Sequence, residues 1–349
     1  MSECNHNCQE CSQKDCGSRD LHEKPNALSN IKKVIGVVSG KGGVGKSSVT
    51  AMLAVALRKK GYRVGVLDAD VTGPSIPKMF NLHEMVRGSE QGVYPAVTET
   101  GIEVISSNFL IADEKSPVLW RGPMIAGMVK QFWTEVIWEN IDFLLIDMPP
   151  GTGDVPLTVF QSITLDGILM ITSPQELVSL IVSKAVNMAS MMNIPVLGLI
   201  ENYSYIKCPH CGERISVFGK SNAEEVAKEF NIKLLDRLPI DPEMATLCDK
   251  GEIEKVDNHY LDNVIDMLES LGLFSSGGPS VRFLTRYDSE VSEPLVGRQG
   301  SRVSMRVARA SASLLSSHGR VRGPAPADPG YSKERRRRRR SGNHCLIKC

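Results

Sequence analysis

Residues 40–47 read Gly-Lys-Gly-Gly-Val-Gly-Lys-Ser and match the phosphate-binding pattern G-x-x-x-x-G-K-[ST]. They follow the apolar run 33–39, which is typical of a buried strand, and precede residues 47–60, whose apolar side chains recur at helical spacing. Such a loop directs backbone N–H groups and a helix N-terminus at phosphate oxygens. The motif therefore predicts a nucleotide-binding domain that starts with a strand, this phosphate loop and a helix; the structural alternative is a glycine-rich turn.

The predicted nucleotide contacts come from the loop and the first turn of the helix. They are Gly40, Lys41, Gly42, Gly43, Val44, Gly45, Lys46, Ser47 and Ser48. Lys46 can reach the β- and γ-phosphates, and the Ser47 hydroxyl can ligate Mg²⁺. Lys41 is a second lysine in the loop, and it can pair with phosphate in its own subunit or in a partner across a face-to-face dimer.

The alternation of strands and helices continues to residue 271. Buried strands are predicted at 63–68, 143–147, 167–173, 195–201 and 233–239, and helices at 175–192, 222–230 and 258–271. Strands that alternate with helices form parallel sheets with right-handed crossovers. We therefore predict an α/β fold, a doubly wound, mostly parallel sheet flanked by helices.

Composition divides the 349 residues into three parts. Residues 1–30 are polar and cysteine-rich, which predicts a flexible arm, and residues 31–271 form an acidic body, which argues against a general nucleic-acid binder. Residues 272–349 are rich in Ser, Gly, Pro and Arg, which predicts a disordered tail. Its basic charge could bind nucleic acid. However, the basic residues change from mostly Lys to mostly Arg where the periodicity ends, which favours a foreign or out-of-frame extension.

Three aspartates follow predicted strands near the phosphate loop. Phosphoryl transfer needs a carboxylate on the magnesium side and a group that orients water. Asp147 leads into Met-Pro-Pro-Gly-Thr-Gly-Asp, typical of a switch loop, and Asp68 and Asp70 end the second strand. We expect Asp147 to hold Mg²⁺ through water and Asp68 to hold Mg²⁺ or water; a single such aspartate could equally be a helix cap. The predicted catalytic residues are Lys41, Lys46, Asp70 and Asp147.

The nine cysteines are too few and too unevenly placed for a disulfide scaffold. Cys208 and Cys211 form a C-x-x-C turn, in which proline and glycine direct both thiolates the same way. Two thiolates complete neither a tetrahedral zinc site nor an iron–sulfur cube, which take four ligands. A symmetric dimer would supply two from each subunit. A redox dithiol and a structural zinc knuckle, completed by His210 or by the partner subunit, are the alternatives.

The N-terminal arm offers four more thiols, Cys4, Cys8, Cys11 and Cys16. Four thiols on a flexible segment could wrap one metal centre without a preformed fold, with His6 as a substitute ligand. The arm is therefore a candidate for a second cluster. Spacing alone does not separate iron–sulfur from zinc.

Six motifs between residues 31 and 271 belong together. They are GKGGVGKS (40–47), DADVTGPSIP (68–77), WRGPM (120–124), DMPPGTGD (147–154), ENYSY (201–205) and CPHCGE (208–213). Together they resemble the Mrp/ApbC family of ATP-binding iron–sulfur cluster carrier proteins, within the MinD/ParA-like NTPases that have a deviant phosphate loop. The resemblance implies ATP and Mg²⁺ as cofactors. It also implies slow ATP hydrolysis, coupled to the loading of a cluster and its transfer to apo iron–sulfur proteins.

The resemblance also implies an assembly and two kinds of contact. It implies a homodimer with one nucleotide per subunit and a bridging 4Fe–4S cluster held by Cys208 and Cys211 of both chains, and contact between Asn202 and adenine. The arm is similar to the cysteine-bearing extension of the eukaryotic cytosolic scaffold branch, although only three residues separate Cys4 from Cys8 where those relatives have a longer gap. Residues 272–349 match nothing in the family.

Two other functions give different expectations. A MinD/ParA-like positioning ATPase with a structural zinc site would use a membrane helix or a basic DNA-binding face, but the predicted helix 258–271 carries Asp and Glu on its polar face. An ATP-driven electron donor similar to the nitrogenase iron protein would place its cysteines elsewhere. No apolar run reaches the length of a membrane span, and residues 1–20 lack the apolar stretch of a signal peptide. We therefore expect a cytoplasmic protein with no membrane partner, and nucleic-acid contact only through the tail.

Overall fold

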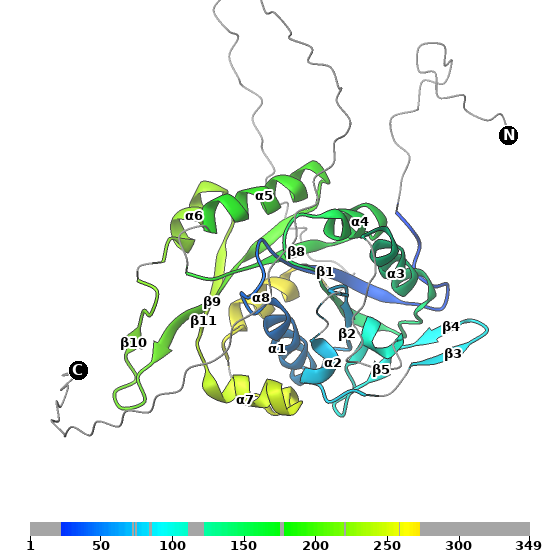
Figure 1. Cartoon of the computed structure of the whole chain (residues 1–349), viewed down its shortest axis with the longest axis horizontal. Coiled ribbons are helices and arrows are strands. Elements are labelled where there is room, and N and C mark those ends of the chain that lie inside the picture. The colour runs from blue at the N-terminus through cyan, green and yellow to red at the C-terminus, as the bar shows by residue number, and fades with distance from the viewer. Residues whose placement is uncertain are drawn as a thin grey trace, which may run out of the picture. The chain divides into compact units, whose positions relative to one another are not determined.

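A mostly parallel sheet forms the centre of the computed structural model (Figure 1). The structure describes residues 22–272 apart from 72, 74, 84–85, 111–121, 175–177, 220 and 258. The strands of the sheet are β1 (Ile31–Ser39), β2 (Val64–Asp68), β5 (Ala96–Val97), β6 (Glu103–Ser106), β7 (Ile141–Asp147), β8 (Gly167–Thr172), β9 (Val196–Lys207), β10 (Arg214–Ile215) and β11 (Leu234–Pro239). A separate hairpin joins β3 (Arg87–Ser89) to β4 (Gly92–Tyr94).

The order across the sheet is β11-β9-β8-β1-β7-β2-β6-β5, and β10 pairs with the far end of β9. Within the described residues every pair in this sheet is parallel except β5 with β6 and β10 with β9. The predicted doubly wound sheet is therefore confirmed. β1, the strand that precedes the phosphate loop, lies between β7 and β8.

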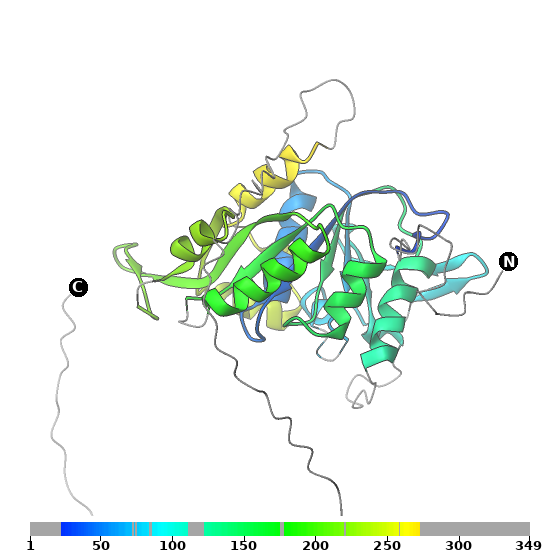
Figure 2. The ribbon, with the colours of Figure 1, turned by 90° about the horizontal axis from the view of Figure 1, so that it is seen from above.

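Eight helices cover the sheet in the described part of the chain. They are α1 (Lys46–Lys59), α2 (Ile76–Met79), α3 (Gly122–Glu135), α4 (Asp154–Ser162), α5 (Val178–Met191), α6 (Ala223–Glu229), α7 (Pro242–Lys250) and α8 (Asp262–Ser270), with short 3₁₀ turns at Ser107–Leu110 and Ile253–Lys255. From β1 through β2 to β5 the chain moves one way across the sheet, and from β5 through β6 to β11 it moves back. Right-handed crossovers therefore place α1 and α2 on one face and α3 to α6 on the other. α7 and α8 return to pack on α2 and α1 (Figures 1 and 2).

The central strands are buried along most of their length, because helices cover both faces of the sheet. Ile35, Leu144 and Leu169 from three neighbouring strands have no exposed surface. In the described residues, no helix combines the length and the apolar character that a membrane crossing requires.

Some elements differ from the sequence-based expectation. β9 continues to Lys207 rather than ending near residue 201, because its last residues pair with β10. The strands β3 to β6 were not predicted, since two to four residues are too few to show a period. α8 begins at Asp262 rather than at 258.

The last part of the predicted arm, residues 22–30, lies against the body. The Glu23 amide donates to the Ser162 carbonyl at the end of α4 (2.7 Å), and Trp133 Nε1 of α3 donates to the Glu23 carbonyl (2.8 Å). The Asn30 amide donates to the Trp138 carbonyl (2.9 Å). The arm cysteines, residues 1–21, and the tail from residue 273 onward lie outside the described residues.

Glu103 on β6 gives a stability prediction. Its Oε2 atom is buried without a hydrogen-bond partner, and burial, followed by the charge of Glu139, raises the pKa of Glu103 to about 7 from an ordinary 4.5. The folded state therefore keeps the proton longer than the unfolded state, and stability falls as pH rises from 4.5 through about 7. Glu103→Gln should remove this loss and add about 1 kcal/mol above pH 7, a figure reduced for partial exposure. Urea unfolding across this pH range measures it; equal stabilities of both proteins at every pH would contradict the assignment.

Candidate functional site

Three parallel strands end side by side beneath the phosphate loop. In the pairing of β7 with its neighbours, Asp147 lies opposite Val37 of β1 and opposite Asp68 of β2. The phosphate loop leaves β1 at this same edge and enters α1 at Lys46. Ligands of doubly wound proteins bind where neighbouring connections diverge to opposite faces, at the carboxyl ends of the strands. The sheet thus brings the loop and both strand-end carboxylates to one place.

Asp147 is the centre of a buried network. Its Oδ1 atom lies 2.7 Å from Lys46 Nζ and accepts a hydrogen bond from Thr50 Oγ1 (2.8 Å), while its Oδ2 atom accepts one from Ser47 Oγ (2.6 Å). The side chains of Lys46 and Asp147 are 5% and 0% exposed. A buried ion pair is tolerated only when further hydrogen bonds satisfy the charges, and the two hydroxyls of α1 provide them.

Asp68 is a second buried carboxylate next to this network. Its Oδ2 atom accepts a hydrogen bond from Ser106 Oγ (3.1 Å), and its Oδ1 atom accepts one from the Asp70 amide (3.2 Å). Burial, and then the charge of Asp147, raise the pKa of Asp68 to about 8. Carboxylate and hydroxyl oxygens are the ligands that Mg²⁺ prefers, so the donor set of Ser47, Asp147 and Asp68 fits that ion.

The phosphate loop surrounds a cavity of about 190 Å³. Its lining includes Lys41, Lys46, Ser47, Ser48 and Asp70, as the sequence predicted, together with Ser75, Met79 and Pro150, which it did not. Pro150 belongs to the loop after β7, and that loop is held to β1 because the Gly151 amide donates to the Ser39 carbonyl (2.8 Å). The loop after β7 thus connects Asp147 to Pro150 in the wall of the cavity.

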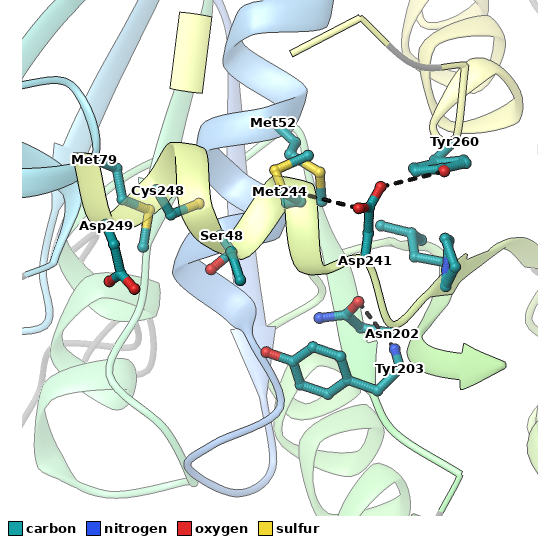
Figure 3. A pocket seen from close by; sticks show the side chains of 13 residues that line it. Ser48, Met52, Met79, Asn202, Tyr203, Asp241, Met244, Cys248, Asp249 and Tyr260 are labelled. Carbon is teal, nitrogen blue, oxygen red and sulfur yellow. Dashed lines mark hydrogen bonds between the residues drawn. The ribbon is translucent and has the colours of Figure 1, made fainter. Parts of the chain in front are cut away.

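A second cavity of about 250 Å³ adjoins the first and shares Ser48 and Met79 with it. Figure 3 shows side chains from α1, β9 and α7 around it. The lining is largely apolar and rich in sulfur: Met52, Met79, Met244 and Cys248. An apolar cavity with a few polar groups beside a phosphate site suits a nucleoside.

The α7 wall of this cavity was missed in the sequence, although a signal for it exists. Asp241 Oδ1 accepts hydrogen bonds from the Glu243 and Met244 amides, and Pro242 occupies the first helical position. A capping aspartate followed by proline is typical of a helix start. Asp241 Oδ2 also accepts a hydrogen bond from the Tyr260 hydroxyl (3.3 Å), which places Tyr260 at the cavity (Figure 3).

Asn202 lines the second cavity and also touches the phosphate loop. Its Nδ2 atom donates to the Val44 carbonyl (2.9 Å), and its Oδ1 atom accepts from the Tyr203 amide (3.0 Å). Gly45 is required at this contact, because its φ is +75° and an added Cβ would lie 2.6 Å from the Tyr203 hydroxyl oxygen and closer still to the Asn202 amide. The backbone of the phosphate loop thus packs directly against the side chains of Asn202 and Tyr203 on β9.

Cys208 and Cys211 lie together at the turn between β9 and β10, which we call the cysteine hairpin (residues 205–215). The turn is closed by hydrogen bonds from the Cys208 amide to the Glu213 carbonyl and from the Gly212 amide to the Cys208 carbonyl (2.9 Å each). Cys208 is buried and Cys211 is exposed. Among the described residues, no three His, Cys, Asp or Glu side chains gather into a metal site, so this chain presents two thiols there.

Comparisons with known proteins agree with this geometry. A family model described as NUBPL iron-transfer P-loop NTPase matches residues 30–271. The chain is 43% identical over 261 residues to an iron–sulfur cluster carrier protein of Methanocaldococcus jannaschii, covering 72% of this chain and 90% of that one. It is 38% identical over 263 residues to the cytosolic Fe–S cluster assembly factor CFD1 of Kluyveromyces lactis, covering 73% and 91%.

A solved structure shares the fold. It is a nucleotide-binding protein of Archaeoglobus fulgidus in complex with ADP, 44% identical to this chain, with a TM-score of 0.60 over 66% of this chain and 91% of that one.

Two glycines of the phosphate loop provide a matched test. Gly43 and Gly45 have almost the same φ, +78° and +75°, but a Cβ at Gly43 would have no atom within 4 Å. Gly43→Ala should therefore cost only the left-handed backbone, about 1–2 kcal/mol, whereas Gly45→Ala should cost clearly more because β9 must also move. Urea unfolding of both variants measures the difference. Equal losses would show that the contact between β9 and the loop is not tight.

Proposed function

Because this chain belongs to the family of NUBPL-type iron-transfer P-loop NTPases, we propose that it is an ATP-dependent carrier that binds a 4Fe–4S cluster and transfers it to apo iron–sulfur proteins. The observation that weighs most is that one strand, β9, lines the nucleotide-sized cavity at Asn202 and continues into the hairpin with the cysteine pair. The names of the relatives from M. jannaschii and K. lactis support the same cargo.

We propose that the nucleotide occupies both cavities. The phosphates lie in the cavity around the phosphate loop, and the adenine lies in the adjacent apolar cavity, where Asn202 contacts it. The contiguity of the cavities through Ser48 and the ADP in the A. fulgidus relative support this placement. Lys46 then exchanges its buried partner Asp147 for phosphate oxygens, and Lys41 reaches phosphate in its own subunit or across a dimer.

The edge of the sheet at which β2 and β7 end in Asp68 and Asp147 suits metal-assisted hydrolysis. We propose that Ser47 ligates Mg²⁺ directly and that Asp147 and Asp68 hold it through water, since these oxygens already converge. The ion would neutralise phosphate charge and lower the pKa of Asp68. Asp70 lies at the same cavity, where it can orient the attacking water together with Asp147. Hydrolysis is proposed to drive loading or release of the cluster.

We propose that the cluster is cargo shared by two copies of the chain. Each copy contributes Cys208 and Cys211, because a 4Fe–4S cluster takes four thiolates and the described residues offer no further ligand beside this pair. The exposed apolar side chains on and after the cysteine hairpin support an interface there: Ile206, Ile215, Val217 and Phe218. A second copy would cover apolar surface that otherwise faces water.

The alternative function, a positioning ATPase with a structural zinc site, receives less support. Its membrane-docking form needs a free apolar helix face, but α8 buries Val264, Ile265 and Leu268 against the body. The word cytosolic in the name of the K. lactis relative supports the cytoplasm as the compartment that we propose.

Ser47 and Thr50 provide a matched pair for the nucleotide site. Each donates one hydrogen bond to Asp147, but Ser47 lines the phosphate-loop cavity and Thr50 does not. Ser47→Ala should lower Mg²⁺-dependent ATP hydrolysis by about tenfold or more, because it removes a direct metal ligand, while Thr50→Ala should mainly lower stability. Steady-state phosphate release and thermal unfolding separate the two effects. Equal turnover in Ser47→Ala and the unmodified protein would refute the magnesium assignment.

Cys208 and Cys248 provide the matched pair for the cargo. After anaerobic reconstitution, Cys208→Ala should lose the iron of the shared cluster and the iron-dependent dimer, while it still binds ATP, because the cysteine hairpin lies outside both cavities. Cys248→Ala removes a thiol from the wall of the apolar cavity, away from the cysteine hairpin, and should keep its iron. Iron analysis, the visible absorption spectrum and sedimentation velocity measure these outcomes. Full iron content in Cys208→Ala, or a monomer that keeps its cluster, would contradict the shared site.

A further inference from the structure

β9 contains a bulge between the nucleotide cavity and the cysteines. Glu201 pairs with Arg237 of β11 and Tyr205 with Pro239, so the interval on β9 is longer than on its partner and residues 202–204 form the bulge. Tyr203 in its middle has φ +59°. The other non-glycine residues with positive φ in the described chain are all asparagines, which tolerate this region. For tyrosine it costs about 1–2 kcal/mol, and such strain is retained where surrounding contacts impose it.

One side of the bulge touches the phosphate loop. Asn202 binds the Val44 carbonyl, and the Tyr203 ring extends from β9 toward the loop that leads into α1 (Figure 3). The ring lies so close to Gly45 that no side chain fits between them. Both Asn202 and Tyr203 also line the adjacent cavity. A molecule in this cavity therefore acts on the bulge directly, and it also acts indirectly when it moves the phosphate loop.

The other side of the bulge is fixed by a buried carboxylate. Glu201 has no exposed surface and accepts hydrogen bonds from Ser204 Oγ (2.6 Å), Arg237 Nε (3.2 Å) and Ser221 Oγ. These bonds join the two ends of the bulge to β11 and to the start of α6. The bulge is therefore fixed at both of its ends. We expect a displacement of Tyr203 in its middle to move the neighbouring residues of β9 as well.

Tyr205, the first residue of the cysteine hairpin, contacts the other arm of the hairpin and is also tied to the residue that follows β11. The Arg214 guanidinium lies 4.6 Å from the centre of the Tyr205 ring, and the Ile240 amide donates to the Tyr205 carbonyl (2.7 Å). Cys208 follows Tyr205 by three residues. A turn of the backbone at Tyr203 thus changes the direction in which the cysteine pair points.

We propose that Tyr203 is a positioning residue that couples the nucleotide cavities to the orientation of the cysteine hairpin. The inference rests on the proposed function, which supplies the nucleotide at one end of β9 and the cluster at the other. The element proposed to couple them, the bulge with Tyr203, is part of the structure itself. A nucleotide favours one arrangement of the bulge because it contacts Asn202 and moves the phosphate loop against the Tyr203 ring. The strained backbone at Tyr203 keeps a relaxed arrangement within reach.

Hydrogen–deuterium exchange of the full chain without iron tests this coupling. A non-hydrolysable ATP analogue with Mg²⁺ should slow exchange in residues 40–47 and change exchange in residues 205–215 by about fivefold or more. Tyr203→Gly adopts the same φ without a ring, so it should keep the protection of the phosphate loop and lose the response of the hairpin. Tyr203→Phe keeps the ring and should respond like the unmodified protein.

The outcomes separate this inference from the proposed function. A hairpin that responds in Tyr203→Gly as in the unmodified protein would overturn the coupling role, as would a hairpin that never responds while the phosphate loop does. Loss of loop protection in Tyr203→Gly would make Tyr203 a nucleotide contact instead; should that variant fail to fold, Tyr203→Asn replaces it, because asparagine tolerates the same φ. No protection of the loop in the unmodified protein would contradict nucleotide binding itself, and the coupling with it. Because iron is absent, a failure of the cluster assignment leaves this measurement unaffected.

Discussion

The buried pair between Lys46 and Asp147 is the interaction on which the site depends. Two charges removed from water must satisfy each other and their remaining hydrogen bonds, or the fold loses several kcal/mol. Here the register of β7 with β1 and β2 places Asp147 under the first turn of α1, and Ser47 and Thr50 complete its hydrogen bonds. The fold therefore holds a lysine and a carboxylate in mutual contact, and under the proposed function phosphates and a metal ion replace that contact.

This arrangement also explains why the neighbouring elements are tied so closely to the phosphate loop. The loop after β7 is hydrogen-bonded to Ser39, and β9 reaches Val44 and Gly45 from the other side. Under the proposed function, nucleotide exchange at Lys46 changes contacts to two segments that leave the site in different directions. One leads through α4 to Ser162, where the Glu23 amide is bound. The other leads along β9 to the cysteine hairpin.

The sequence predicted those parts of the site that contiguous motifs form. The structure brings the phosphate loop, Asp147 and Asp68 together, because each stands at the end of a buried apolar run and parallel strands end at one edge. Thr50, Ser106 and Tyr203 were missed. Their partners lie far away in sequence, 97 residues for Thr50 with Asp147 and 38 residues for Ser106 with Asp68, so only the three-dimensional register reveals them. The Tyr203 backbone is likewise invisible in a sequence, since tyrosine is an unusual choice for positive φ.

Under the proposed function, each chain holds only half of the cluster site, and this changes what release of the cluster requires. When two thiols come from each of two chains, the grip on the cargo depends on how the two hairpins face each other, and the thiolates themselves need no chemical change. In the proposed symmetric dimer, a small rotation of each hairpin would act on both cysteine pairs at once. The bulge at residues 202–204 lies where such a rotation can start, between the cavity proposed for the nucleotide and a turn closed by its own hydrogen bonds. Under the proposed coupling, a stiff hairpin on a strained bulge converts nucleotide occupancy into a change in affinity for the cluster.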